Sequence, residues 1–213
     1  MSKAISEIME IVEMRMNKVR GSHDLEHTKR VYTMAVKLAK KEKADLNIVK
    51  LSAILHDIAR HKEDLSKGRL CHAKVGAETA RKILNKAGFK IKVINDVCHC
   101  IRTHRFRDNY MPETIEAKVL FDADKLDSIG AIGIGRAFLF AGEVGAALNN
   151  KALDIAKTKP YTEEDTAYRE YMVKLRYIKD KLFTKTGKKM ASDRHSFMKT
   201  FFKRFALECA SKK

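Results

Sequence analysis

The sequence predicts an all-α protein: a helical bundle with a C-terminal helical extension. Apolar residues recur every three or four positions almost throughout the chain, which is the period of one helix face. Only two prolines occur in 213 residues, so helices can run long. No β-hairpin pattern, internal repeat or low-complexity linker is evident. We therefore expect a single domain over residues 1–213, with its core at about 20–140 and C-terminal helices at about 163–210.

The first half of the chain divides into helices separated by short breaks. Gly21 and Ser22 interrupt the apolar pattern, and Asp45 suits the N-cap of a helix because its carboxylate can accept from free amide groups. The polar segment 61–70 is predicted to be a loop. Helices are predicted at residues 4–17, 24–43, 45–57, 72–86 and 91–104.

The second half continues the helical pattern after a basic and aromatic loop at 105–113. A helix is expected from about Thr114, and a glycine-punctuated apolar segment leads into the next one. A connector is expected at 149–161, and Thr186-Gly187 is expected to separate the last two helices. These last helices are predicted at about 163–183 and 191–210.

Charge and composition narrow the class of protein. The formal net charge of +17 favours anionic partners such as nucleotides, nucleic acid or acidic surfaces. The N-terminus lacks a signal-peptide core, and the most apolar stretch contains Arg136 and Glu143, which argues against a membrane span. No CxxC pair occurs among the four cysteines, so free thiols in a reducing, cytoplasmic setting are expected.

The functional interpretation depends first on residues 51–60, LSAILHDIAR. This stretch places His56 and Asp57 side by side in an apolar run that we expect to be a buried helix. Burying two ionisable groups is costly unless something pairs them. A divalent metal ion is the least strained common partner for an adjacent imidazole and carboxylate.

Two distant residues lie on apolar helix stripes and can reach the same ion. His27 shares the face of Val31 and Leu38, and Asp124 follows Leu120 by four residues, which turns it inward. Mixed imidazole and carboxylate ligands suit Mn, Fe, Co, Ni, Zn or Mg rather than a soft-metal site. The sequence leaves the identity of the metal open.

The ordered set resembles the HD superfamily of metal-dependent phosphohydrolases. The resemblance is carried by HDLEHTKRV, LHDIAR and DADKLDSIGAIGIGRAF, and it covers about residues 20–140. These motifs are similar to those of soluble bacterial and archaeal HD-domain hydrolases, a branch that includes nucleotide pyrophosphohydrolases. The resemblance implies that the helical bundle is an HD domain. It also implies one divalent ion, with manganese among the candidates, and allows a second. The implied metal ligands are His27, His56, Asp57 and Asp124.

Other site residues follow from the resemblance and from position. His72 and His104 match places where several HD families keep histidines that contact substrate phosphate or a second metal. Asp57 acts mainly as a ligand, so Asp127, one turn after Asp124, is a candidate to orient a ligand or to serve as general base. Asp122 is expected to be an N-terminal structural residue. Candidate phosphate contacts beside the ligand segments are Arg30, Arg60, Arg105 and Lys125.

The leading hypothesis is metal-assisted hydrolysis of a nucleoside triphosphate to the monophosphate and pyrophosphate. Alternatives within the same chemistry are a nucleoside monophosphate phosphatase and a cyclic-nucleotide phosphodiesterase. A different class is a nucleic-acid-binding or signalling module with a structural metal. It is motivated by 13 Lys and Arg against 3 Asp and Glu after residue 173, with phenylalanines at 197, 201, 202 and 205 among them. That phenylalanine spacing is also typical of one buried helix face.

Overall fold

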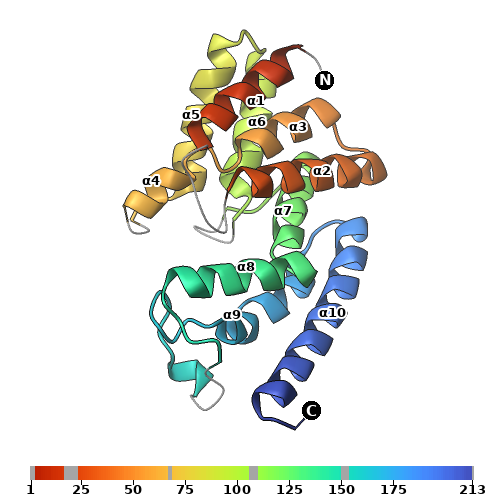
Figure 1. The fold of residues 1–213 in the computed structure, drawn as a ribbon. Coiled ribbons are helices and arrows are strands. Elements are labelled where there is room, and N and C mark those ends of the chain that lie inside the picture. The colour runs from red at the N-terminus through yellow and green to blue at the C-terminus, as the bar shows by residue number, and fades with distance from the viewer. Residues whose placement is uncertain (1–2, 17–23, 67–68, 106–109, 150–153, 213) are drawn as a thin grey trace. The chain divides into compact units, whose positions relative to one another are not determined.

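A computed structural model of the chain describes residues 3–16, 24–66, 69–105, 110–149 and 154–212. Within these residues the secondary structure is helical and contains no strand, so the predicted all-α class is confirmed (Figure 1). The predicted break at Gly21 and Ser22 lies outside the described residues, as do residues 106–109 of the predicted loop and residues 150–153 of the predicted connector. None of the described helices is long and apolar enough to cross a membrane.

The chain contacts divide into two compact units. The first unit contains residues 1–124 and 183–186, and the second contains 125–182 and 187–213. The expectation of a single domain over residues 1–213 stays a prediction.

The first unit contains the helices that carry the candidate site. Helices α5 and α6 pack against each other, as do α2 and α3. The helices are α1 (Lys3–Met16), α2 (Leu25–Glu42), α3 (Leu46–Leu55), α4 (Arg60–Leu65), α5 (His72–Lys86), α6 (Ile91–Thr103) and, up to Asp124, α7 (Ile115–Asp127).

Local capping explains where α2 and α3 begin. Asp24 accepts a hydrogen bond from the backbone N–H of His27 at 2.9 Å, which fixes the first turn of α2. Asp45 accepts from the amides of Asn47 and Ile48, as predicted for the N-cap of α3. These caps hold His27 and the segment before His56 in defined positions.

The predicted helix through Asp57 is wrong at its end. Helix α3 ends at Leu55, and His56 to Ala59 form a turn. His56 donates from Nδ1 to the carbonyl of Ala53 at 2.8 Å, and this carbonyl is the one that the amide of Asp57 would use in a continued α-helix. The amides of Ile58 and Arg60 instead bond to carbonyls three residues back. The prediction of a loop at 61–70 is wrong in its first half, where α4 extends to Leu65.

A glycine allows α5 to approach this turn. A Cβ added at Gly76 would lie 3.4 Å from the carbonyl oxygen of His56 and 3.5 Å from Cγ2 of Ile101. The small residues predicted for this helix therefore serve close packing, and the helix lies directly against the turn that carries the His-Asp pair.

The second unit contains the rest of the chain. Its elements are α8 (Gly130–Glu143), the 3₁₀ helix η1 (Ile155–Lys157), α9 (Ala167–Val173), the 3₁₀ helix η2 (Leu175–Lys181) and most of α10 (Lys185–Cys209). The predicted helix 163–183 is therefore two shorter helices separated at Lys174. The predicted break at Thr186-Gly187 is also wrong, because α10 continues through a buried Gly187.

Aromatic residues form the core of the second unit. The ring of Phe202 stacks on that of Tyr171 with centroids 4.3 Å apart. The ring of Phe138 makes edge-on contacts with those of Phe201 and Phe205. These phenylalanines of α10 thus form a packed face, whereas Phe197 is 52% exposed.

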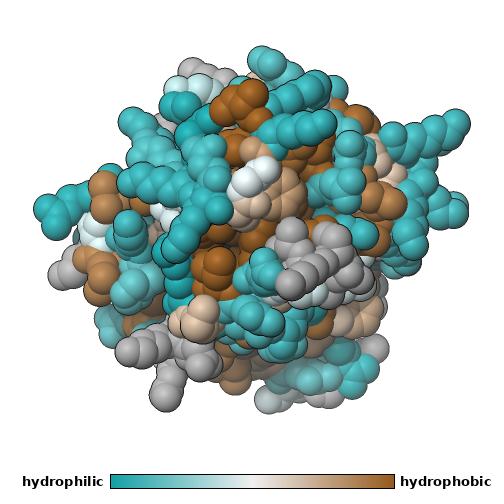
Figure 2. All heavy atoms as spheres, turned by 90° about the horizontal axis from the view of Figure 1, so that it is seen from above, coloured by the Kyte–Doolittle hydropathy of each residue, from teal (hydrophilic) through white to brown (hydrophobic). Residues whose placement is uncertain are grey.

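Charged residues make up 33% of the chain. On the face shown in Figure 2, hydrophilic side chains surround smaller patches of hydrophobic ones. The four cysteines carry free thiols, and Cys98 and Cys100 are buried, as expected.

Candidate metal centre

Asp57 lies at the centre of a buried cluster of histidines. Its side chain is only 4% exposed and follows the end of α3. Its two carboxylate oxygens face different histidine pairs. The described residues that could hold a metal ion form two groups of three, and one consists of His27, His56 and Asp124 while the other consists of Asp57, His72 and His104.

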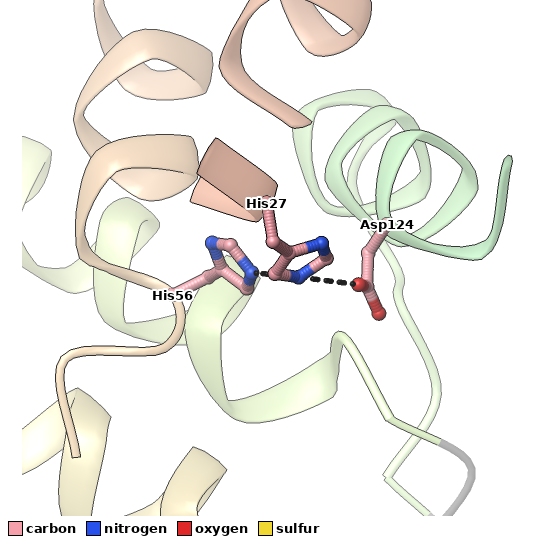
Figure 3. Close-up of side chains that lie close together, drawn as sticks. All are labelled: His27, His56 and Asp124. Atoms are coloured by element: carbon pink, nitrogen blue, oxygen red, sulfur yellow. Dashed lines mark hydrogen bonds and ion pairs between the residues drawn. The ribbon is translucent and has the colours of Figure 1, made fainter. Parts of the chain in front are cut away.

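The first group joins α2, the turn after α3 and α7. Nε2 of His27 lies 3.4 Å from Nε2 of His56 and 3.4 Å from Oδ1 of Asp124, and the three side chains point toward one another (Figure 3). Oδ2 of Asp57 lies 3.6 Å from Nε2 of His27 and 3.7 Å from Nε2 of His56. All four ligands expected from the sequence therefore converge, and Asp124 is the one that is partly exposed, at 13%.

The second group lies on the other oxygen of Asp57. Oδ1 lies 3.0 Å from Nε2 of His72 and 3.7 Å from Nε2 of His104. The two Nε2 atoms are 3.1 Å apart. His72 is the first residue of α5, and His104 follows α6 directly. The structure thus brings both additional histidines to the carboxylate of Asp57.

Both groups have the spacing of a metal coordination shell. Ligand atoms about 2.1 Å from a shared ion stand about 3.0 to 3.5 Å from each other, depending on the coordination angle. The separations within the two groups, and between Asp57 and the histidines of the first group, run from 3.0 to 3.7 Å, so the longest exceed this range by about 0.2 Å. The residues therefore fit a divalent ion in composition and in spacing.

The tautomers of two histidines suit metal binding. Nδ1 of His56 lies 2.8 Å from the carbonyl oxygen of Ala53, and Nδ1 of His104 lies 2.6 Å from that of Ile101. A carbonyl oxygen can only accept, so each ring carries a proton on Nδ1. The lone pair of Nε2 then faces Asp57 in both residues, which is the form that binds metal.

Burial and charge set the protonation of the cluster. Burial lowers the pKa of His104 to about 4 and also lowers the pKa of His56, so both rings are neutral near pH 7. Burial would raise the pKa of Asp57, but the neighbouring His56 and His72 hold it well below its usual value. Near pH 7, Asp57 is therefore a carboxylate and His56 and His104 are neutral imidazoles, the species that coordinate a cation.

His72 differs because it faces carboxylates on both sides. Its burial opposes the charged form, yet Asp57 and Glu63 together raise its pKa. Nδ1 of His72 lies 2.5 Å from Oε2 of Glu63, and Nε2 lies 3.0 Å from Oδ1 of Asp57. Glu63 was not among the residues selected from the sequence, where the only signal is an acidic residue between the His-Asp pair and His72.

Two of the four candidate phosphate contacts lie beside His72. Nη1 of Arg105 is 3.1 Å from Nδ1 of His72 and donates to Glu63 at 2.7 Å, and Nη1 of Arg60 is 3.4 Å from the same Nδ1. Arg30 is half-buried in α2.

The remaining candidates lie along the last turns of α7. Lys125 and Asp127 belong to the second unit, where Arg136 donates to the carboxylate of Asp127 at 3.0 Å. We expected Asp122 near the start of the helix, and this is wrong, because it lies in the C-terminal half of α7. Its carboxylate accepts from the amides of Phe183 and Thr184, so it is structural, as predicted.

Comparison with known proteins adds independent information. The family model of the HD domain matches residues 24–129. YpgQ of Bacillus subtilis is 33% identical over 211 residues, which span 93% of this chain and 90% of YpgQ. The crystal structure of YpgQ in complex with ADP has a TM-score of 0.76 and 30% identity, covering 97% of this chain and 95% of that one. A predicted HD superfamily hydrolase from an uncultured Thermotogales bacterium is 33% identical, with a TM-score of 0.68 and coverage of 95% and 91%.

Proposed function

Because the chain belongs to the HD superfamily of hydrolases, we propose that it hydrolyses phosphate bonds in nucleotides. The proposed substrate is a nucleoside triphosphate, and the proposed products are the monophosphate and pyrophosphate. The observation that carries the proposal is the position of Asp57, whose two oxygens face two pairs of buried histidines.

We propose that His27, His56, Asp57 and Asp124 hold one divalent ion, and that His72 and His104 contact substrate phosphate or a second ion. A bound divalent ion lowers the pKa of a coordinated water and neutralises phosphate oxygens. The spacing of the ligand atoms and the neutral Nε2 atoms of His56 and His104 support this assignment.

The cationic side chains beside His72 support an anionic substrate. Arg60 and Arg105 both place Nη1 within 3.4 Å of Nδ1 of His72. Guanidinium groups bind phosphate oxygens through paired donors. Arg30 and Lys125 stay candidates for the same task. The crystal structure of YpgQ with ADP supports a nucleotide as the ligand.

We propose that the general base is one of the acids or imidazoles of the site. Asp57 is a ligand in this proposal, so the general base falls to Asp127, His72 or His104. Asp127 already accepts from Arg136 at 3.0 Å, and this ion pair keeps its carboxylate in one orientation.

A nucleic-acid-binding or signalling role is the second candidate, and the basic C-terminal segment is the observation that favours it. The packing of Phe201, Phe202 and Phe205 against other aromatic rings leaves only Phe197 of that series largely exposed. A gel shift at two salt concentrations tests this role, because phosphate-driven binding weakens steeply with salt.

A metal-by-nucleotide screen tests the proposal. The metal-free protein is assayed with Mn²⁺, Mg²⁺, Ni²⁺, Fe²⁺, Co²⁺ or Zn²⁺ against nucleoside tri-, di- and monophosphates and cyclic nucleotides, with products separated by chromatography. Pyrophosphate from a triphosphate supports the proposal. Free phosphate from a monophosphate supports the phosphatase, and a linear monophosphate from a cyclic nucleotide supports the phosphodiesterase. Hydrolysis in no combination, or full activity in His56→Ala and Asp57→Ala, would overturn it.

A further inference from the structure

A single carboxylate oxygen of Glu63 accepts three hydrogen bonds. Oε2 accepts from the backbone N–H of His72 at 2.9 Å, from Nδ1 of His72 at 2.5 Å and from Nη1 of Arg105 at 2.7 Å. Glu63 lies in α4 and is only 5% exposed. One buried acid thereby connects α4, the first residue of α5 and the segment that follows α6.

The position of His72 in its helix explains why it needs this acid. His56 and His104 follow the C-terminal ends of α3 and α6, where free backbone carbonyls are available, and each ring donates to the carbonyl three residues before it. His72 begins α5, where the free groups are N–H donors rather than carbonyls. A side-chain acceptor from another helix is therefore required to hold the Nδ1 proton of His72.

We infer that Glu63 is a positioning residue that keeps the proton of His72 on Nδ1, so that the Nε2 lone pair faces Asp57, and that it anchors Arg105 beside the ring. Two carboxylates compete for the ring proton, and Glu63 at 2.5 Å is closer than Asp57 at 3.0 Å. His56 and His104 are held by backbone carbonyls and His72 is held by Glu63. In all three residues Nε2 then faces the carboxylate of Asp57.

Removal of Glu63 has a defined consequence for the ring. Asp57 becomes the remaining carboxylate acceptor, so the proton of the neutral ring moves to Nε2, the atom that faces the site. A protonated Nε2 can neither coordinate a cation nor accept a proton. Arg105 loses its ion-pair partner in the same change. The consequence for catalysis rests on the proposed function, whereas the tautomer does not.

Histidine ¹⁵N chemical shifts of the metal-free protein test the inference, at a pH where the ring of His72 is neutral. Wild type is compared with Glu63→Ala, Glu63→Gln and the control Glu78→Ala, which removes an exposed acid from α5. His72→Gln identifies the signal. We expect the proton on Nδ1 in wild type and Glu78→Ala and on Nε2 in Glu63→Ala. We expect Glu63→Gln to keep the proton on Nδ1 in part of the molecules, because its amide oxygen can still accept a hydrogen bond. This variant also tests the inference if Glu63→Ala does not fold.

Metal affinity, measured by calorimetric titration, and hydrolysis rates complete the test. We expect Glu63→Ala to lower metal affinity or kcat about 10- to 100-fold, with Glu63→Gln between it and wild type and Glu78→Ala unchanged. An Nδ1 proton retained in both Glu63 variants would overturn the inference, even if wild type hydrolyses nucleotides. A displaced proton with no hydrolysis by wild type would instead support the positioning role and contradict the proposed function.

Discussion

Oδ1 of Asp57 lies 3.0 Å from Nε2 of His72, while its other oxygen faces His27 at 3.6 Å. One carboxylate is thereby shared by two groups of potential metal ligands. Asp124 belongs to the first group, where its Oδ1 lies 3.4 Å from Nε2 of His27. Substitution of Asp57 should therefore affect metal binding at both groups, and substitution of Asp124 should affect it at one.

We expect Asp57→Asn to weaken metal binding at both groups and Asp124→Asn to weaken it at the first group alone. Loss of a coordinating carboxylate should cost at least about 100-fold in affinity, since even residues that only orient ligands cost about 10- to 100-fold. Calorimetric titration of the metal-free protein with Mn²⁺ measures both affinity and stoichiometry. Asp96→Asn, which removes a partly exposed charge of α6 that pairs with Lys92, is the control. Wild-type binding by Asp57→Asn would contradict the shared role.

Two of the metal ligands predicted from the sequence lie on regular helices. His27 and Asp124 lie on helix faces whose apolar period gives their direction, and the structure places them together at 3.4 Å. The same argument located His104 beside α6. Periodicity identifies which side of a helix faces the core, so ligands that lie on such faces can be found without coordinates.

The rest depends on hydrogen bonds that no periodicity encodes. His56 uses the carbonyl of Ala53 and ends α3, so the predicted helix through Asp57 is wrong although the apolar pattern continues. Glu63 lies in a polar segment that resembles a solvated loop, yet it is buried by partners from α5 and from the segment after α6. A local side-chain hydrogen bond decides the first outcome, and contacts with other segments of the chain decide the second.

Asp122 lies close to the ligand Asp124 in the sequence, but we expect its substitution to lower the free energy of unfolding. Its carboxylate accepts from the amide of Phe183 at 2.9 Å and from both the amide and the hydroxyl of Thr184, at 2.7 and 2.6 Å. Asp122→Ala leaves these buried donors without an acceptor, so we expect a loss of about 2–5 kcal/mol in the free energy of unfolding by urea. Thr184→Val removes one donor and should cost about 1 kcal/mol. Equal losses in the two variants would contradict this account.

The metal-free protein should lose stability as the pH falls from about 6.5 to about 4. Burial lowers the pKa of His104 to about 4 in the folded state, against a usual value of 6.5. Between these values the unfolded chain binds the extra proton, so stability rises with pH and is lost on acidification. The shift corresponds to at most about 3 kcal/mol.

His104→Gln isolates this contribution, because it removes the titrating ring but leaves the other acids of the site. Urea unfolding at several pH values between 4 and 7, in the presence of a chelator, should give a shallower pH dependence for His104→Gln than for wild type. His61→Gln, at an exposed position, should follow wild type. Parallel curves for wild type and His104→Gln would mean that His104 does not stay neutral in the folded protein.

Thermal unfolding should occur in one transition if residues 1–213 form the single domain expected from the sequence. The chain passes between the two compact units three times, after Asp124, Leu182 and Thr186, so neither unit is a continuous segment. Both α7 and α10 contribute residues to each unit. Melting one unit alone would therefore remove residues from one end of α7 or of α10 and leave the adjoining turn of that helix with unpaired backbone groups. Differential scanning calorimetry should give equal calorimetric and van't Hoff enthalpies, of about 150 kcal/mol for a chain of this size. Two resolved transitions, or a van't Hoff enthalpy near half the calorimetric value, would show instead that the two units unfold independently.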